Sequence, residues 1–495
     1  MTKRTKLVCT LGPAVDSEST LRGLILAGMD VARCNFTHGT HAEHKARMDR
    51  LKKVRRELGA PCALMLDTKG PGIRTGRLEG GKPVLLRAGD TIVLTEQDLP
   101  GTARRIHQSH AGLAALVQPG TIILLDDGHI ELAVDRTCGT DIQCTVQNSG
   151  TLGECKTVNL PGTEVPLPAM TAQDEEDLRF GIEQGVDFVA ASFVASGDDV
   201  RAIRAFLDEN GGQAIRIVAK IENARAIEHI DDIIAASDAV MVARNDLGVE
   251  LPAKEVPHIQ KKIIRACNRA YRPVITATQM LESMIRSPRP TPAEVADMAC
   301  AIYDGADGVM LSGETARGRY PVPAVQTAAR IAEASEPYLY SEGSVPNRTS
   351  NATGISAGVG LAAVTTAEAV GASCIVTPTT TGRTARLISN YRPRLPIYAL
   401  APTQQICRSL ALCWGVTPLV GQVEGSASFI LENAQAQVLE GGYASEGDIA
   451  VFTLGDRTTS PRSESDGSGG GPLEGAYCPT NVMHVVQLGC EGGTR

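Results

Sequence analysis

Aromatic residues are scarce in this chain of 495 residues: Phe, Trp and Tyr together make up 3%, with a single Trp. The core must therefore be built from aliphatic side chains, which suit buried parallel strands and the helices that cover them. No apolar run reaches the roughly 18–20 residues that a membrane span requires, and the N-terminus lacks the apolar core of a signal peptide. We therefore expect no membrane partner and a cytoplasmic location.

Paired cysteines and excess basic charge are also missing. The 13 Cys include no C-x-x-C pair, which argues against a disulfide framework or a zinc site and favours reduced thiols. Lys plus Arg total 48 against 56 for Asp plus Glu, a net charge of −8 that argues against nucleic acid as a partner. A G-x-x-x-x-G-K-[ST] run is absent as well, so a bound nucleotide would not be held by a P-loop.

What the chain does contain is a series of short β-branched apolar runs that alternate with helical patterns. Eight such runs separated by helices predict an α/β fold, a closed (β/α)8 barrel of parallel strands. The runs are 6–10, 30–36, 62–68, 188–194, 216–222, 239–243, 273–278 and 308–313.

The region between the third and fourth runs has a different pattern of apolar and polar residues. Segments 84–95 and 121–134 alternate apolar and polar residues and carry turn signals, as antiparallel strands do. We predict a small β-barrel domain at 72–163, inserted between the barrel parts 1–71 and 164–343. An insertion at this βα loop would cover the C-terminal face of the barrel as a lid.

The residue pattern changes again in the C-terminal part of the chain. A linker pattern at 341–351 precedes further strand and helix patterns, which predict a C-terminal α/β three-layer domain at 354–495. Within it, residues 456–475 form a low-complexity loop. The stretch GVGLAA (358–363) matches G-x-G-x-x-A, but it follows no predicted strand, so we interpret it as a packed Gly/Ala-rich helix.

Polar residues interrupt the ends of seven of the eight runs. One such residue would be read as the start of a solvated loop, but convergence from seven strands indicates an active site at the C-terminal face, because burying unpaired charge is costly. These residues are Arg33, Asn35, Asp67, Thr68, Ser192, Lys220, Glu222, Arg244, Asp246, Thr278, Ser312 and Glu314.

This set of residue types has an interpretable chemistry. Glu222 and Asp246 come from adjacent strands and suit Mg²⁺ (or Mn²⁺), which takes few protein oxygens and keeps several waters. Lys220, Arg33 and Arg74 would surround an anionic, phosphate-bearing substrate. The pattern therefore predicts phosphoryl transfer, which requires mainly positioning and charge neutralisation.

Two further groups accompany this set. The oxygen-rich residues Asn35, Thr37, Asp67 and Thr68 would suit a second, monovalent cation. His38, His41 and His44 are spaced by three, but no H-E-x-x-H pattern accompanies them. We interpret them as solvated or nucleotide-facing side chains rather than as a metal site.

At these strand ends the sequence resembles the pyruvate kinase family, and the resemblance covers nearly the whole chain. The motifs are MDVARCNFTHGTH (29–41), MLDTKGPGIRTG (65–76), NLPGTEVPLP (159–168), AKIEN (219–223), MVARNDLGVELP (241–252), ATQMLESM (277–284), MLSGETARG (310–318) and, more loosely, TGRTARLISNYRP (381–393). The resemblance implies a TIM barrel with lid and regulatory domain, transfer of phosphate from phosphoenolpyruvate to ADP to give pyruvate and ATP in glycolysis, Mg²⁺ and K⁺ as cofactors, and a homotetramer.

The resemblance also implies roles for single residues. Lys220 matches the lysine that stabilises the phosphoryl group in flight, Glu222 and Asp246 match the ligands of the divalent metal, and Thr278 matches the threonine implicated in protonating the enolate. At the substrate, the resemblance implies phosphoryl contact for Arg33, substrate contact for Ser192, Arg244 and Asn245, and support of the proton path for Ser312 and Glu314. It implies potassium binding for Asn35, Thr37, Asp67 and Thr68. The implied nucleotide contacts are Pro13, Asn35, His38, Arg74 and Lys156.

Four positions depart from the family pattern. Thr37 replaces the usual Ser and keeps the hydroxyl, and Gly72 replaces a Glu or Lys associated with the potassium requirement. Because Thr68 favours a potassium-dependent enzyme, we expect potassium dependence. Asn245 replaces Gly, so freedom at positive φ is partly lost. Glu43 replaces an aromatic residue near the nucleotide.

The C-terminal domain contains a candidate effector loop, TTTGRT (379–384), ahead of a predicted helix. Its residues Thr379, Thr380, Thr381, Gly382, Arg383 and Thr384 offer hydroxyls and backbone amides. Such a loop suits the phosphate of a sugar-phosphate or nucleotide effector, and it equally suits an ordinary helix-capping loop.

Two other functions remain at this stage. Magnesium-dependent barrels also make and break carbon–carbon bonds through pyruvate-like enolates, but the inserted lid and Thr278 within ATQML argue against this class. A catalytically silent relative acting as a regulatory binding protein is the second alternative. The presence of Lys220, Glu222, Asp246 and Thr278 together argues against it.

Overall fold

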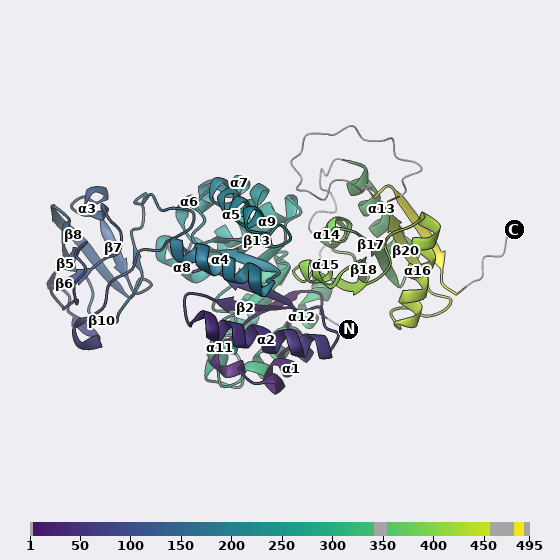
Figure 1. The fold of residues 1–495 in the computed structure, drawn as a ribbon, viewed down its shortest axis with the longest axis horizontal. Coiled ribbons are helices and arrows are strands. Elements are labelled where there is room, and N and C mark those ends of the chain that lie inside the picture. The colour runs from purple at the N-terminus through teal and green to yellow at the C-terminus, as the bar shows by residue number, and fades with distance from the viewer. Residues whose placement is uncertain (1–2, 341–353, 456–479, 490–495) are drawn as a thin grey trace.

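A computed structural model of the chain describes residues 3–340, 354–455 and 480–489. An all-β domain, a barrel and an α/β domain follow one another along the long axis of the molecule (Figure 1). The predicted linker at 341–351 and the predicted loop at 456–475 lie outside the described residues.

The central body is a closed barrel of eight parallel strands, in the order β1-β16-β15-β14-β13-β12-β3-β2. Each of the eight predicted runs forms one of these strands, which confirms the fold class. The strands are β1 (Lys6–Thr10), β2 (Val31–Asn35), β3 (Ala63–Asp67), β12 (Phe188–Ala191), β13 (Arg216–Ile221), β14 (Ala239–Ala243), β15 (Val274–Ala277) and β16 (Gly308–Leu311).

Helices surround the barrel, and several begin at a capping box, in which a Thr or Ser side chain and an acidic residue three positions later bond to each other's backbone amides. This arrangement starts α2, α4, α5 and α10. The helices are α1 (Glu18–Leu26), α2 (His41–Glu57), α4 (Ala172–Gln184), α5 (Gly197–Glu209), α6 (Ala224–Glu228), α7 (Ile230–Ala236), α8 (Arg244–Glu250), α9 (Val256–Arg269), α10 (Pro292–Tyr303), α11 (Gly313–Ala316) and α12 (Pro321–Ser335).

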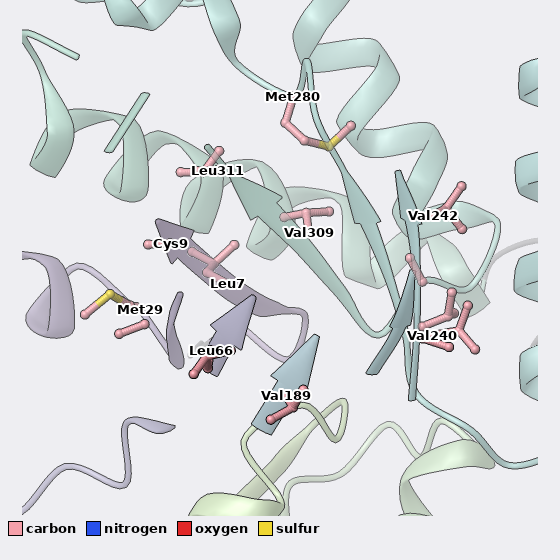
Figure 2. Packing of buried hydrophobic residues seen from close by; sticks show 14 of the residues in the cluster. Leu7, Cys9, Met29, Leu66, Val189, Val240, Val242, Met280, Val309 and Leu311 are labelled. Carbon is pink, nitrogen blue, oxygen red and sulfur yellow. The ribbon is translucent and has the colours of Figure 1, made fainter. Parts of the chain in front are cut away.

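Alternation along the strands divides the barrel into two apolar layers. In β1, Leu7 and Cys9 belong to the large cluster between strands and helices, whereas Val8 belongs to a separate cluster inside the barrel. Figure 2 shows the larger cluster, with side chains such as Val240 and Val309 from neighbouring parts of the barrel. Continuous burial on both faces explains why these strands are aliphatic throughout.

The all-β domain leaves the barrel after β3 and returns before α4. It has a six-stranded sheet in the order β11-β7-β8-β9-β5-β6 and a two-stranded sheet of β10 and β4. The antiparallel pairing predicted for its alternating segments is confirmed. Its elements are β4 (Val84–Leu86), β5 (Thr91–Thr95), β6 (Arg105–His107), α3 (Leu113–Leu116), β7 (Ile122–Leu125), β8 (Ile130–Cys138), β9 (Asp141–Val146), β10 (Gly150–Leu152) and β11 (Val158–Asn159).

The C-terminal domain has a five-stranded sheet in the order β19-β18-β17-β20-β21, with β21 antiparallel to β20. The stretch 358–363 lies within α13, so its interpretation as a packed helix is confirmed. The elements are α13 (Ile355–Ala369), β17 (Cys374–Pro378), α14 (Arg383–Asn390), β18 (Ile397–Ala401), α15 (Gln404–Ser409), β19 (Val416–Val420), α16 (Ala427–Glu440), β20 (Ile449–Leu454) and β21 (Val482–Gln487).

The C-terminal domain packs against the end of the barrel opposite the all-β domain (Figure 1). Ala411 and Leu412 belong to the same apolar cluster as Val8, Met65 and other side chains of the barrel interior. In the described parts of the chain the cysteines are all free thiols. Over those same parts, none of the helices has the length and apolar character needed to cross a membrane.

Candidate active site

Lys220 lies near the end of β13, and its ammonium group is surrounded by oxygen-bearing side chains. Its Nζ is 2.8 Å from Glu222 Oε1 and 3.1 Å from Asp67 Oδ1, and it donates to Ser192 Oγ at 2.7 Å. Burial by itself lowers the pKa of Lys220, but the charges of Asp67 and Glu222 outweigh this and raise the pKa above its ordinary value. Lys220 is therefore held in place as a permanent cation.

Asp67, the last residue of β3, links Lys220 to a second cation. Its Oδ2 accepts a hydrogen bond from Arg33 Nε at 2.6 Å, and Arg33 Nη1 donates to Thr10 Oγ1 at 3.0 Å. Burial raises the pKa of Asp67, but Arg33 and Lys220 more than offset this and hold it below its ordinary value. The rim thus presents two fixed positive charges that share one carboxylate.

The four residues predicted to bind potassium lie together at the ends of β2 and β3. Asn35 pairs with Asp67 in the strand register, and Asn35 Oδ1 accepts from the Thr37 N–H at 3.1 Å. Thr68 Oγ1 accepts from the Ser192 N–H at 3.1 Å. The structure therefore brings these side chains to one edge, beside Lys220.

Glu222 and Asp246 follow the neighbouring strands β13 and β14. Glu222 Oε2 accepts from the Phe193 N–H at 2.6 Å. Burial, and then the charge of Glu222, raise the pKa of Asp246 to about 7. Glu222 is buried and Asp246 is half-buried, and the charge of Glu222 raises the pKa of Asp246 although Lys220 lies nearby. A divalent cation would neutralise this repulsion between the two carboxylates, so these residues fit a Mg²⁺ site.

No group of three or more His, Cys, Asp or Glu side chains suited to a metal occurs in the residues that the structure describes. A cation between Glu222 and Asp246 would therefore take its other ligands from water and substrate oxygens. This is the usual pattern for Mg²⁺, which dehydrates reluctantly and is often bound through one or two carboxylates.

The backbone is strained where β12 and β15 reach the site. Phe193, Thr278 and Gln279 have φ values of 58°, 68° and 53°. A residue other than glycine in this left-handed region costs of the order of 1–3 kcal/mol, and such residues cluster at functional sites. Both the segment after Ser192 and the segment that presents Thr278 are therefore held in an unfavourable conformation by their surroundings.

Arg244 and Asn245 support the strained segment. Arg244 donates to the carbonyl oxygens of Ala277, at 3.2 Å, and Thr278, and its Nη1 lies 2.6 Å from Asp297. The Asn245 N–H donates to Thr278 Oγ1 at 3.0 Å. Asn245 lies in α8 and is not among the residues with positive φ, so this position makes no demand for glycine.

Glu314, in α11, connects the ends of β15 and β16. Its Oε1 accepts from the Leu281 N–H at 3.0 Å and its Oε2 from the Ser312 N–H at 2.8 Å. Burial raises the pKa of Glu314 despite these hydrogen bonds. Glu314 thus fixes the backbone at Ser312, as a support rather than as an exposed group.

The pKa of His38 reflects its burial and the positive charge that gathers between the barrel and the all-β domain. Burial lowers its pKa, and the nearby positive charges of Arg74, Arg33, Arg317 and Lys156 lower it further. Arg74 lies in the segment that leads into the all-β domain, and Lys156 lies in the segment that leads out of it. The two segments pair through a β-bridge between Arg74 and Thr157. A region where several cations surround one imidazole suits a polyphosphate.

The other two histidines have structural roles. His44 is buried and stacks on Phe36, with ring centroids 4.1 Å apart. His41 Nε2 lies 2.6 Å from Asp177 Oδ1. The interpretation of His44 as solvated or nucleotide-facing is wrong, because the helix face that the spacing of three creates packs against the barrel.

The remaining predicted residues lie elsewhere. Pro13 begins a short 3-10 turn (Pro13–Val15) after β1 and is exposed at the same rim. The candidate effector loop lies in the C-terminal domain at the start of α14, which has no side-chain cap. Its Thr379 Oγ1 accepts from the Gly382 N–H at 2.9 Å, and its Thr384 Oγ1 is 2.5 Å from Thr480 Oγ1.

Two residues of the site were missed by sequence reasoning. Thr10 ends β1 and accepts from Arg33, so the same rule of reading strand ends would have found it in the first run. Arg317 contributes positive charge near His38 from beyond β16. It lies within the motif MLSGETARG (310–318) but five residues past Ser312, so reading the strand ends alone did not single it out.

Models of two pyruvate kinase domains match successive parts of the chain. The family model described as pyruvate kinase, barrel domain, matches residues 2–325. The model described as pyruvate kinase, alpha/beta domain, matches residues 358–465.

Individual relatives agree with these models. A pyruvate kinase of Clostridium acetobutylicum is 44% identical over 454 residues, which cover 92% of this chain and 96% of that protein. One of Sporosarcina psychrophila is 46% identical and covers 92% of this chain and 78% of its own length. A crystal structure of a pyruvate kinase from Cryptosporidium parvum superposes with a TM-score of 0.86 at 38% identity, covering 98% of this chain and 96% of that chain.

Proposed function

The chain belongs to the pyruvate kinase family, which transfers the phosphoryl group of phosphoenolpyruvate to ADP to give pyruvate and ATP, and from this premise we propose that the strand-end cluster around Lys220 is its catalytic site. The observation that carries the proposal is the arrangement of Lys220 and Arg33 on a shared Asp67, beside Glu222 and Asp246. Two fixed cations next to a divalent-cation site are what a migrating phosphoryl group requires.

Lys220 and Arg33 act on the phosphoryl group in this proposal. Charge on the transferring phosphoryl oxygens is stabilised best by groups already fixed in place, because nothing must reorganise as the bond breaks. Asp67 and Ser192 hold Lys220, and Thr10 and Asp67 hold Arg33. Arg74 and Lys156, from the lid segments, with Pro13, Asn35 and His38, face the nucleotide phosphates.

The family generally requires a divalent metal and K⁺. We assign Mg²⁺ (or Mn²⁺) to Glu222 and Asp246, and K⁺ to Asn35, Thr37, Asp67 and Thr68. When bound, the divalent ion supplies Lewis-acid stabilisation of the enolate oxygen left by phosphoryl transfer.

The enolate must then receive a proton to become pyruvate. We assign this role to Thr278, and the hydrogen bonds that it receives from Asn245 and Arg244 support the assignment. Ser312, whose backbone is held by Glu314, supports the path on the adjacent strand. The all-β domain would close over the site and exclude water, so that the phosphoryl group passes to ADP and not to water.

Replacing Lys220 by Met tests the assignment. We expect Lys220→Met to lower kcat by about 100-fold or more, because a fixed charge on the transition state is lost. Pyruvate release from phosphoenolpyruvate, ADP, Mg²⁺ and K⁺ is followed with a coupled dehydrogenase, and circular dichroism checks the fold. The exposed Lys45, paired with Asp49 on α2, gives the control Lys45→Met, which should remain active. Full activity of Lys220→Met would remove Lys220 from the mechanism.

Replacing potassium by tetramethylammonium tests the monovalent site. We expect turnover to fall strongly, because the larger cation cannot fit among Asn35, Thr37, Asp67 and Thr68. Turnover is measured at constant ionic strength with Mg²⁺ present. Undiminished activity would show that Gly72, and not Thr68, decides the potassium requirement.

The proposal extends to location, assembly and regulation. We propose a cytoplasmic homotetramer, in keeping with the free thiols of the described residues and with exposed apolar side chains on the C-terminal domain at Ile355, Phe429 and Val485. We propose the loop 379–384 as the site of a phosphate-bearing effector, supported by the uncapped first turn of α14. Sugar phosphates and nucleotides titrated at low phosphoenolpyruvate test it, and no response would leave a helix-capping loop.

A further inference from the structure

An aspartate immediately precedes each of four alternate barrel strands. Asp30, Asp187, Asp238 and Asp307 stand before β2, β12, β14 and β16. Each carboxylate accepts a hydrogen bond from the backbone N–H at the foot of the strand next to its own. The donors are Leu7 at 2.7 Å, Leu64 at 2.9 Å, Ile217 at 2.9 Å and Val274 at 3.0 Å.

Two of these aspartates are paired within the barrel body. Asp30 forms an ion pair with Lys3, just before β1. Asp238 Oδ1 lies 3.0 Å from Arg216 Nη1, at the start of β13. Their charges are therefore satisfied without the C-terminal domain.

The other two are paired with the C-terminal domain, Asp187 in addition to its contact with Arg55 of the barrel. Arg408 Nε, in α15, donates to Asp187 Oδ1 at 2.7 Å, and Arg392 Nη1 lies 3.0 Å from Asp307 Oδ1. In the closed strand order β12 and β16 are four places apart in either direction. The C-terminal domain thus contacts the N-terminal end of the barrel at two diametrically opposite strands.

Arg392 is built into this contact and is not a loose surface side chain. It is 1% exposed, its guanidinium lies 4.9 Å from the centre of the Trp414 ring, and its Nη2 donates to Gly305 O at 2.8 Å. Its backbone has a φ of 48°, a conformation that persists only where the surroundings determine it.

The two contacted strands, β12 and β16, end next to residues of the proposed catalytic site. Asp187 is separated from Ser192, which holds Lys220, only by the four residues of β12. Through Leu64, Asp187 also holds β3, which ends at Asp67. Because close-packed strands shift as rigid units, a displacement at the foot is transmitted to the rim.

We propose that Asp187 and Asp307 are positioning residues through which the C-terminal domain aligns the catalytic ends of β12 and β16, with Arg408 and Arg392 as the groups that grip them. Neither aspartate contacts the reacting atoms. This inference rests on the transfer reaction assigned above, and it gives the C-terminal domain a role in setting the geometry of the site, independent of any effector.

The experiment compares two arginines that contact the same carboxylate. Arg408 reaches Asp187 from the C-terminal domain, whereas Arg55 Nη1 reaches it at 3.4 Å from α2 of the barrel. We expect Arg408→Met to lower kcat/KM for phosphoenolpyruvate by about fivefold or more, and Arg55→Met to stay within about twofold of wild type, although both lower Tm. Arg408→Lys, which keeps the charge, should recover part of the loss.

Hydrogen exchange of the peptide 188–194 gives a readout that does not depend on activity. Exchange should rise in Arg408→Met and not in Arg55→Met. The inference is overturned if Arg408→Met lowers Tm while kcat, KM and exchange remain as in wild type, or if both variants lose activity equally. If Arg408→Met does not fold, Arg408→Lys is judged by the same criteria. An inactive wild type would refute the assigned reaction, and the exchange comparison would still decide this inference.

Discussion

Buried hydroxyl groups in this protein differ in whether they have hydrogen-bond partners. At the catalytic rim, Ser192 Oγ accepts from Lys220 and donates to Thr68 O at 2.7 Å. On β15, next to the strand that precedes Asp246, Thr276 is fully buried, and its Oγ1 has no hydrogen-bond partner in the described part of the chain. The first hydroxyl holds Lys220 in the proposed catalytic site, whereas the second only costs free energy of desolvation.

Replacing Thr276 by Val should therefore raise the free energy of unfolding by about 1 kcal/mol, since the methyl group fills the same space without an unsatisfied hydroxyl. Urea unfolding measures this. Thr315 is the matched control, because its buried Oγ1 donates to Thr10 O at 2.8 Å, so Thr315→Val should be destabilising. Equal destabilisation of both variants would show that the unpaired hydroxyl of Thr276 carries no cost.

Two departures from the family pattern also have structural explanations. Glu43 completes the capping box of α2, where its Oε2 accepts from the Thr40 N–H at 2.7 Å. A Cβ on Gly72 would lie 3.1 Å from the ring of Phe193. A larger residue at 72 would therefore press on the strained segment beside Ser192.

Helix caps fix the elements from which the site is built. At the start of α10, Thr291 Oγ1 accepts from the Glu294 N–H at 3.3 Å, and Glu294 Oε2 accepts from the Thr291 N–H at 2.7 Å. Glu294 also accepts from the Ser283 N–H at 2.7 Å, which ties the segment after Thr278 to the helix. The cap thus joins the start of α10 to the segment that follows Thr278.

Loss of this cap should be measurable. Thr291→Ala is expected to lower the free energy of unfolding by about 1 kcal/mol, because an amide of the first turn loses its acceptor. Thr291→Ser keeps the hydroxyl and should remain close to wild type in the same denaturant titration. A Ser variant as unstable as the Ala variant would show that the methyl group, and not the cap, matters.

At the scale of the whole molecule, the C-terminal domain closes the foot of the barrel. Leu412 is 1% exposed and shares an apolar cluster with Met65, Val218 and Met241 from three barrel strands. The barrel interior is therefore completed by a residue from another domain, and the two bodies should unfold with strong coupling.

Leu412→Ala is expected to lower the free energy of unfolding by about 2–5 kcal/mol, the cost of a cavity in a packed core. Leu26, 71% exposed on α1, provides the control, and Leu26→Ala should change it by no more than about 0.5 kcal/mol. Guanidinium unfolding followed by circular dichroism measures both. Equal effects would contradict the packing of Leu412 beneath the barrel.

The eight strands, the antiparallel insertion and the order of residues at the rim could be predicted from local patterns, because period-two and period-3.6 repeats and the residue types at strand ends are properties of short segments. The folded chain was needed to show that Asp67 holds both Lys220 and Arg33, that Thr10 joins them, that His44 is buried, and that Arg408 reaches Asp187 from another domain. These depend on which segments meet in space, and a pairing between residues 221 positions apart leaves no trace in either local pattern.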